Sequence, residues 1–302
     1  MISIAPHDVR KILSSHILAD GFEPVIDLEK SHGTWIVDAR NGREYLDLFS
    51  MFASMPLGYN HPRIVEAREM LAEAAMNKPT NSDIYSTQMA EFVETFFQVA
   101  VPDGFEHAFF IEGGALAVEN ALKASFDWKV KKNLRKSPDR DLGSKVIHFR
   151  DCFHGRSGYT LSMTNTWDPR KVAYFPKFDW PRIVNPKITF PLSLERQKEL
   201  ESLEQEAKDQ IHQAIEEYGD DIACLIIEPI QGEGGDNHFR KEFLQSLRHI
   251  CDEHEILLVF DEIQTGFGLT GRMWAFENFG VVPDLLCFGK KTQVCGFIGG
   301  RR

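Results

Sequence analysis

Polar and small residues stand at or directly after the ends of five apolar segments of the sequence. They are, in chain order, Gly113-Gly114-Ala115 after HAFFI (107–111), Phe153-His154-Gly155-Arg156 after KVIHF (145–149), Glu228 and Glu233 in and after CLIIEPI (224–230), Asp261 and Gln264 after ILLVF (256–260), and Lys290 after LLCF (285–288). Together these residues supply an amine, several carboxylates, a guanidinium group and glycine-rich turns. This combination of groups is enough for covalent amine chemistry.

These groups match the requirements of a pyridoxal phosphate (PLP) enzyme. A lysine amine binds that cofactor and moves a proton, and a carboxylate keeps its ring nitrogen protonated. Backbone N–H groups at a helix N-terminus hold the phosphate, and an arginine receives a substrate carboxylate. Each residue also has an ordinary explanation: Asp261 as a helix cap, and Lys290 as half of a surface lysine pair. Spacing alone leaves both interpretations open.

The elements that carry these residues alternate between strands and helices. Between the five apolar segments, amphipathic patterns predict helices at 115–129, 195–217 and 241–253, the second with a solvated, charge-rich face. Alternation of this kind is typical of an α/β domain with a mainly parallel sheet, in which ligands bind at the carboxyl ends of the strands. Nearer the N-terminus, Asn41-Gly42 predicts a hairpin within 34–49, followed by a helical stretch over 63–77.

Composition narrows the class of protein. The 302 residues include 45 acidic and 34 basic side chains, a net charge of −11, which argues against nucleic acid as a partner. We find no signal peptide and no apolar run long enough to span a membrane, so we expect a cytoplasmic protein with no membrane partner. Five cysteines without CxxC spacing predict reduced thiols. The sequence has no HExxH motif, so we expect no metal site of that kind.

At the residues above, the sequence resembles the class III (omega-amino-acid) aminotransferases. LGYNHP is similar to the family's Gly-x-x-His-Pro segment, and LLVFDEIQTGFGLTGRMWAFENFGVVPDLLCFGK resembles its signature block in order and length. The family's Schiff-base lysine follows its ring-nitrogen aspartate by 29 residues, the separation of Lys290 from Asp261. The resemblance implies the α/β, PLP-dependent transferase fold type I. It places an N-terminal segment of a small domain at 1–62 and the PLP-binding large domain, with a mainly parallel sheet, at 63–302.

The resemblance also assigns roles to the residues at the strand ends. Lys290 and Asp261 would be catalytic, and Asp261 would bind the ring nitrogen of the cofactor. The backbone of Gly114 and Ala115 would bind its phosphate. The remaining cofactor contacts would be made by Phe153 on the ring face, Gln264 at the ring hydroxyl, and Glu228. Arg156 would bind a substrate carboxylate. Glu233 would be a gate whose arginine partner lies in the C-terminal part of relatives. The family further implies a homodimer.

Within the family, FHGRSGYTLSMTNT, EPIQGEGGDNHFR and FGKKTQVCG most resemble the L-lysine 6-aminotransferases. They imply transfer of the ε-amino group of L-lysine to 2-oxoglutarate, giving 2-aminoadipate 6-semialdehyde and L-glutamate. A 4-aminobutyrate or other omega-amino-acid aminotransferase is the nearest alternative, since eukaryotic-type 4-aminobutyrate enzymes share the double lysine. An NAD-binding fingerprint, GFGLTG (266–271), is disfavoured because five residues separate it from its strand.

The sequence departs from the family pattern in two places. Gly113-Gly114-Ala115-Leu116 replaces the usual Ser-Gly-Ser/Ala-Glu turn, which keeps backbone donors but loses a serine hydroxyl. Relatives also continue well past the lysine, whereas this sequence ends twelve residues after Lys290. We therefore expect the C-terminal small domain to be missing, and a truncated homologue without activity is a further alternative.

Overall fold

The computed structural model describes residues 3–77, 83–139 and 141–300. The chain divides into two compact units between Glu91 and Phe92. The boundary predicted at residues 62 and 63 stays a prediction.

The first unit is built from short elements. They are α1 (Val9–Ser14), β1 (Trp35–Val37), β2 (Glu44–Leu46), α2 (Ser50–Ala53), α3 (Pro62–Glu66) and α4 (Arg68–Met76). Strands β1 and β2 pair antiparallel, as the Asn41-Gly42 signal predicts, and Gly42 has the positive φ (+75°) that such a turn needs. The predicted helical stretch 63–77 is two helices, because the backbone leaves helical geometry at Ala67.

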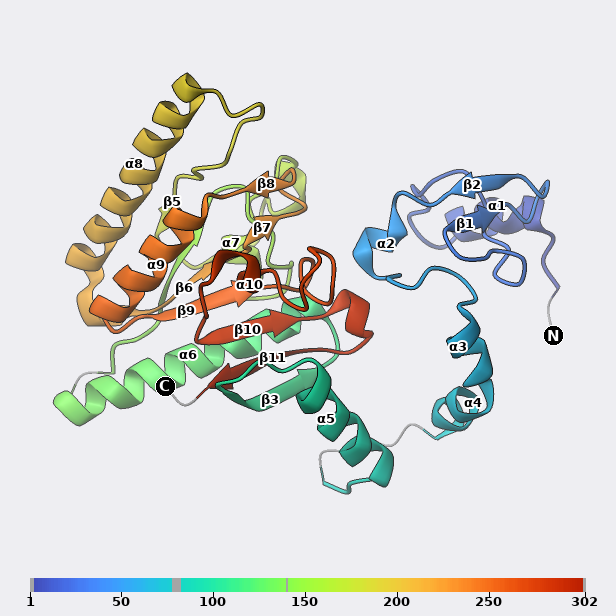
Figure 1. The fold of residues 1–302 in the computed structure, drawn as a ribbon, viewed down its shortest axis with the longest axis horizontal. Helices are drawn as coiled ribbons and strands as arrows, with labels where there is room; N and C mark the ends of the chain where they lie inside the picture. Colours follow the sequence, from blue (N-terminus) through green and yellow to red (C-terminus); the bar gives the residue numbers. More distant parts are fainter. Residues whose placement is uncertain (1–2, 78–82, 140, 301–302) are drawn as a thin grey trace. The chain divides into compact units, whose positions relative to one another are not determined.

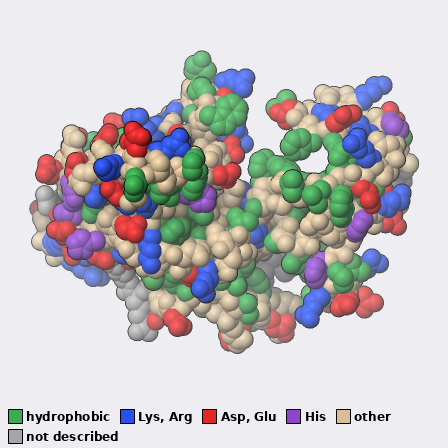
Figure 2. All heavy atoms as spheres, turned by 45° about the horizontal axis from the view of Figure 1, so that its top comes forward, with side chains coloured by type: hydrophobic (Ala, Val, Ile, Leu, Met, Phe, Trp, Pro, Cys, Tyr) green, Lys and Arg blue, Asp and Glu red, His purple; other side chains and the backbone are tan. Residues whose placement is uncertain are grey.

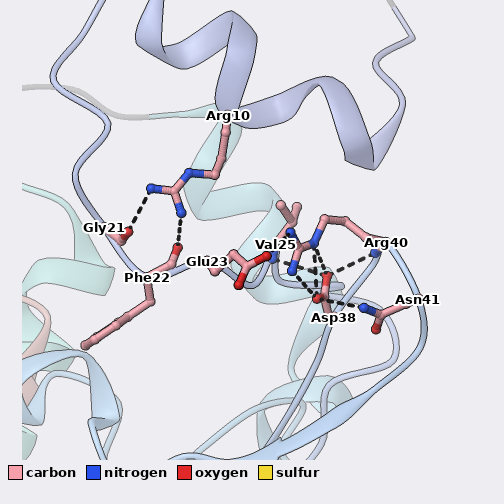
Figure 3. Close-up of polar contacts among 8 residues, drawn as sticks. All are labelled: Arg10, Gly21, Phe22, Glu23, Val25, Asp38, Arg40 and Asn41. Carbon is pink, nitrogen blue, oxygen red and sulfur yellow. Dashed lines mark hydrogen bonds and ion pairs between the residues drawn. The ribbon is translucent and has the colours of Figure 1, made fainter.

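A buried carboxylate organises the turn after β1 (Figure 3). Asp38 accepts hydrogen bonds from Nε (3.0 Å) and Nη2 (2.7 Å) of Arg40 and from the backbone N–H of Val25 (3.3 Å). The Arg40 guanidinium, against the opposing effect of desolvation, holds the pKa of Asp38 below its ordinary value. Arg40 also reaches Glu23, so one arginine joins two separate segments of this unit.

The second unit contains a seven-stranded sheet in the order β3-β11-β10-β9-β6-β4-β5 (Figure 1). The strands are β3 (Phe105–Ile111), β4 (Lys145–Phe149), β5 (Arg182–Ile183), β6 (Ile222–Ile227), β9 (Leu257–Asp261), β10 (Leu285–Phe288) and β11 (Cys295–Gly300). β10, β9, β6, β4 and β5 pair in parallel, whereas β11 runs antiparallel to both β10 and β3. The expected mainly parallel α/β sheet is confirmed.

Helices cover both faces of this sheet. They are α5 (Thr87–Val99), α6 (Gly114–Lys136), α7 (Thr160–Met163), α8 (Leu194–Tyr218), α9 (Lys241–Glu253) and α10 (Phe276–Phe279), and a small hairpin is formed by β7 (Ile230–Gln231) and β8 (Asn237–His238). Successive residues of β6 alternate between two cores: Leu225 packs in the core that includes α8 and α9, and Ile226 in the core that includes α6. Burial on both faces explains why β6, β9 and β10 are continuously apolar.

The predicted elements differ from the structure mainly at their ends. All five predicted strands and all three predicted helices are present, and α9 has the predicted bounds. The prediction for the third strand, 224–230, is wrong at its end, since β6 stops at Ile227 and Glu228 lies outside the sheet. Helix α6 continues to Lys136, beyond the predicted residue 129.

Strand β11 was not predicted, and its glycines explain both its place and its weak sequence signal. A side chain at Gly296 would come within 2.1 Å of the backbone oxygen of Phe109 on β3. Glycine is therefore required for close pairing, but it contributes no apolar pattern.

Charges cover the outer helices of the second unit as expected. On α8 only one stripe is buried, formed by Leu200, Glu204, Ala207, Ile211 and Ala214. Figure 2 shows acidic, basic and histidine side chains intermingled on the half that carries α8 and α9. Among the residues that the structure describes, no helix is long and apolar enough to cross a membrane.

Candidate active site

Lys290 follows β10 and begins a short 3₁₀ turn, Lys290–Thr292. Its φ is +53°, a left-handed conformation that costs energy for a residue with a side chain. The Lys290 Nζ donates a 2.8 Å hydrogen bond to Oε1 of Gln264, which follows the adjacent strand β9. Two of the predicted site residues therefore lie in direct contact.

The surroundings of Lys290 and Lys291 differ in charge. Burial lowers the pKa of Lys290, and the carboxylates of Asp261, Glu228 and Glu233 oppose that change. Lys291 instead bonds to the backbone oxygen of Gln264, and burial, together with repulsion from Lys290, lowers its pKa to about 8. Carboxylates therefore act on both lysines: Asp261, Glu228 and Glu233 on Lys290, and Glu262 on Lys291.

Asp261, the last residue of β9, is buried against a histidine. Its Oδ2 lies 2.7 Å from Nδ1 of His154, and its Oδ1 accepts the backbone N–H of Ile263 at 3.1 Å. Nε2 of His154 is buried and has no hydrogen-bond partner among the described residues. Burial lowers the pKa of His154, but its interactions with Cys152 and Asp261 outweigh burial and raise the pKa well above the ordinary value.

Glu228 links two of the loops at this edge. Its buried carboxylate accepts the backbone N–H groups of Phe153 (2.8 Å) and Gly232 (3.3 Å). Burial raises the pKa of Glu228 to about 7, against the opposing charge of His154. The backbone of Phe153 is therefore fixed, while its side chain remains partly exposed.

The turn between β3 and α6 meets the other loops closely. Gly113 has φ +97°, and α6 begins at Gly114. A side chain at Gly114 would come within 3.0 Å of the Ile263 side chain, and one at Gly155 would come within 2.4 Å of Cβ of Ala115. The first backbone N–H groups of α6 thus lie beside the loops that carry Asp261 and Phe153, which is where a phosphate would be held.

The loop between β7 and β8 packs against the same group. A side chain at Gly232 would come within 2.5 Å of Nε2 of Gln264, and one at Gly234 within 1.9 Å of the backbone oxygen of Asp151. Glu233, between these glycines, forms an ion pair with Lys171 (Nζ–Oε1 2.9 Å).

Arg156 lies apart from the other predicted residues. It is exposed and lines a cavity of about 640 Å³ with Glu119, Lys123 and Tyr159. Within the described part of the chain, no hydrogen bond or ion pair joins Arg156 to the Lys290 group.

Three residues of this site were not predicted from the sequence. His154 stands inside the Phe153–Arg156 motif, so its position was a usable signal; Ile263 stands between Asp261 and Gln264. Lys171 carried no signal, since its partner Glu233 lies 62 residues further along the chain. No group of three or more metal-binding side chains occurs among the residues that were searched, which are the described ones.

The site and the fold match known proteins. A model of the family described as "Aminotransferase class-III" matches residues 18–300. An L-lysine-epsilon aminotransferase of Mycobacterium tuberculosis is 53% identical over 300 residues, 98% of this chain and 66% of that protein. A solved structure of lysine aminotransferase from M. tuberculosis in the internal aldimine form matches with a TM-score of 0.94 at 53% identity, covering 99% of this chain and 68% of that one.

A 4-aminobutyrate aminotransferase of Emericella nidulans is more distant, at 32% identity over 295 residues, 91% of this chain and 58% of that protein. The chain spans about two thirds of the length of the lysine enzymes that it matches, 66% in the case above.

Proposed function

The chain belongs to the class III aminotransferases, and we propose that it moves the ε-amino group of L-lysine to 2-oxoglutarate with the help of PLP. One observation carries the chemistry: the Lys290 amine is hydrogen-bonded to Gln264 at the carboxyl edge of the sheet, where the buried Asp261 ends β9. The 53% identity to L-lysine-epsilon aminotransferases supports the choice of substrates over 4-aminobutyrate, whose enzyme is 32% identical.

The residues of the site fit PLP. Gly114 and Ala115 offer backbone N–H groups for its phosphate, Asp261 a carboxylate for its ring nitrogen, Gln264 an amide for its hydroxyl, Phe153 a ring to cover it, and Lys290 an amine to bind it. The buried, unpartnered Nε2 of His154 marks this edge as a place where polar groups are held without full pairing. When bound, PLP supplies an electron-withdrawing ring that stabilises negative charge at a substrate carbon.

Lys290 is suited to move a proton. Burial lowers its pKa, which makes loss of the ammonium proton easier than in water. A neutral amine at this place acts as nucleophile and then as general base, and the ammonium form returns the proton. The hydrogen bond to Gln264 fixes the direction of the amine.

His154 orients Asp261. Because the imidazole Nδ1 is 2.7 Å from Oδ2, and the backbone N–H of Ile263 binds Oδ1, the carboxylate is held from two sides. A carboxylate fixed in this way is ready for a protonated nitrogen without reorganisation.

Two charged side chains suit the two substrates, one in the loop that packs on Gln264 and one, Arg156, at the separate cavity. Glu233 offers a carboxylate for a cationic amine, and Arg156 a guanidinium for a substrate carboxylate. A homodimer, as the family implies, is part of this proposal.

The proposal is tested by labelling and by turnover. The purified chain is incubated with PLP, reduced with borohydride and mapped by mass spectrometry, and glutamate is measured with L-lysine and 2-oxoglutarate as substrates. We expect the label on Lys290, lost in Lys290→Met and retained in Lys291→Met, which is the matched control. A label on Lys291 refutes the site, and turnover of 4-aminobutyrate without turnover of L-lysine refutes the donor.

A further inference from the structure

The turn after β10 presents two lysine amines to one residue of the neighbouring loop. The turn is closed by the backbone N–H of Gln293, which donates to the carbonyl of Lys290 at 3.0 Å. The Lys290 amine donates to the side-chain Oε1 of Gln264 at 2.8 Å. The Lys291 amine donates to the backbone oxygen of the same residue at 2.5 Å. Two neighbouring lysines therefore hold Gln264, one by its side chain and the other by its backbone.

Lys291 is a buried amine that the proposed mechanism does not use. Only 9% of the residue is exposed, and burial is the main cause that lowers the pKa of its amine to about 8. Glu262, which is 1% exposed, is the carboxylate that opposes this change. A buried ammonium group is costly to keep, so a lysine at this position calls for an explanation in terms of what its amine binds.

The loop after β9 is anchored on both sides of Gln264. On one side, the backbone N–H of Ile263 donates to Asp261 at 3.1 Å. On the other, the hydroxyl of Thr265 donates to Glu262 at 3.2 Å, and the same carboxylate accepts two backbone N–H groups at the start of α10 at 2.6 and 2.8 Å. The bond from the second lysine reaches the backbone between these two anchors.

We propose that Lys291 is a positioning residue for Gln264 and, through it, for the Lys290 amine. By binding the Gln264 carbonyl, it fixes the backbone from which the side-chain amide reaches Lys290. The amide is then already in place for the Lys290 amine and for the hydroxyl of PLP. The cofactor part of this inference rests on the proposed function, whereas the hold of Lys291 on the loop does not.

The first test needs no PLP. Amide hydrogen exchange of the full chain is followed by mass spectrometry in a peptide that covers 263–266, whose first and last N–H groups are bonded within the loop. In Lys291→Met the loop should open more readily, so this peptide exchanges roughly tenfold faster. Lys291→Arg, which keeps a cationic donor, should restore slow exchange, and Lys291→Leu serves as a second apolar variant. Exchange at the wild-type rate in the apolar variants refutes the positioning role.

The matched control is Lys129→Met. Lys129 is 1% exposed, and its amine also donates to a backbone oxygen, that of Glu255 at 3.1 Å. Glu255 precedes β9, at the opposite end of the strand from Asp261. The control should therefore leave exchange in 263–266 and the affinity for PLP unchanged, even where it lowers the melting temperature. Equal acceleration of exchange in Lys129→Met and Lys291→Met would mean general loosening and refute a specific role for Lys291.

The second test is a double-mutant cycle on the Kd for PLP, measured by absorbance titration. Lys291→Met and Gln264→Ala should each raise this Kd roughly tenfold. The double variant should bind PLP no more weakly than Gln264→Ala alone, because the lysine acts through the amide that the alanine removes. Lys291→Arg should bind PLP within about twofold of wild type, since it restores the donor.

The outcomes separate the two proposals. If exchange in 263–266 responds as expected but the wild-type chain neither binds PLP nor transfers an amine from L-lysine, the hold of Lys291 on the loop stands and the proposed function fails. If PLP binds and L-lysine is turned over, but the double variant binds PLP another tenfold more weakly than Gln264→Ala, the proposed function stands and the role of Lys291 through Gln264 is refuted.

Discussion

Two buried aspartates, one in each unit, are held in opposite ways. Asp38 is gripped by both Nε and Nη2 of Arg40 and by the backbone N–H of Val25. Asp261 has one side-chain partner, His154, and beyond it the Nε2 atom of that histidine is buried without a partner in the described residues. The first network closes on itself, whereas the second stays open.

We propose that this difference separates a structural carboxylate, Asp38, from a functional one, Asp261. An arginine fork satisfies a carboxylate within the protein and leaves little capacity for a ligand. A buried polar atom without a partner costs about 1–3 kcal/mol, and a native structure that retains such a cost calls for an explanation. At Asp261 the explanation that we favour is a carboxylate kept ready for a cationic ligand group.

The largest effect is expected for Asp261→Asn. Loss of the charge removes the electrostatic support of the proposed reaction, so lysine-dependent glutamate formation falls about 10²–10³-fold. The fold should persist, because the amide still accepts the hydrogen bond of Ile263. Initial rates and thermal unfolding of the same samples measure both; a rate within threefold of wild type contradicts the functional role of Asp261.

A smaller effect is expected for His154→Gln, which keeps a donor near Asp261 but loses the titratable ring. We expect a loss of activity of about tenfold, as for other residues that orient a reacting group. Because the folded-state pKa of His154 is raised above its ordinary value of 6.5, its stabilising effect is complete below that pH and is lost as pH rises through the folded-state pKa.

The check on His154 is the unfolding free energy of both proteins at several pH values. The difference in unfolding free energy between wild type and His154→Gln should be largest at acid pH and become smaller at alkaline pH. A difference that is constant with pH would show that the imidazole charge has no part in holding Asp261.

Asp38→Asn affects stability and not catalysis. Arg40 loses its buried ionic partner and keeps only the exposed Glu23, so the melting temperature should fall by several degrees while the rate per folded molecule stays unchanged. Since the pKa of Asp38 is held below its ordinary value of 3.8, the stabilisation is complete above that pH and is lost as pH falls further. A loss of amine transfer in folded Asp38→Asn would contradict the purely structural role that we assign to Asp38.

Sequence reasoning reached the parts of this molecule that depend on local pattern. The strands β6, β9 and β10 were predictable because burial on both faces makes them continuously apolar. Asp261 and Lys290 could be chosen as site residues because they stand at the ends of such apolar runs. β11 escaped prediction because its glycines, required by the close approach of β3, carry no such pattern.

The partners of the site residues were beyond the reach of sequence patterns. His154 meets Asp261 across 107 residues and Lys171 meets Glu233 across 62, so neither pair leaves a periodic trace in the sequence. These contacts are fixed only when β4, β6 and β9 pair and bring their following loops together.

The smallest effect is expected for Glu228→Gln, which tests a third buried carboxylate against the other two. Burial raises the pKa of Glu228 from 4.5 to about 7, so the uncharged form that glutamine imitates is more accessible near neutral pH than in an exposed glutamate. Activity at pH 7 should change less than threefold.

Because the folded protein binds the proton more tightly than the unfolded chain, wild type loses stability as pH rises from 4.5 through 7, and the variant does not. Unfolding measured at pH 5 and pH 8 checks this sign. A variant that is less stable than wild type at pH 8 by more than at pH 5 would mean that Glu228 is needed as an anion, like Asp38, to hold the N–H groups of Phe153 and Gly232.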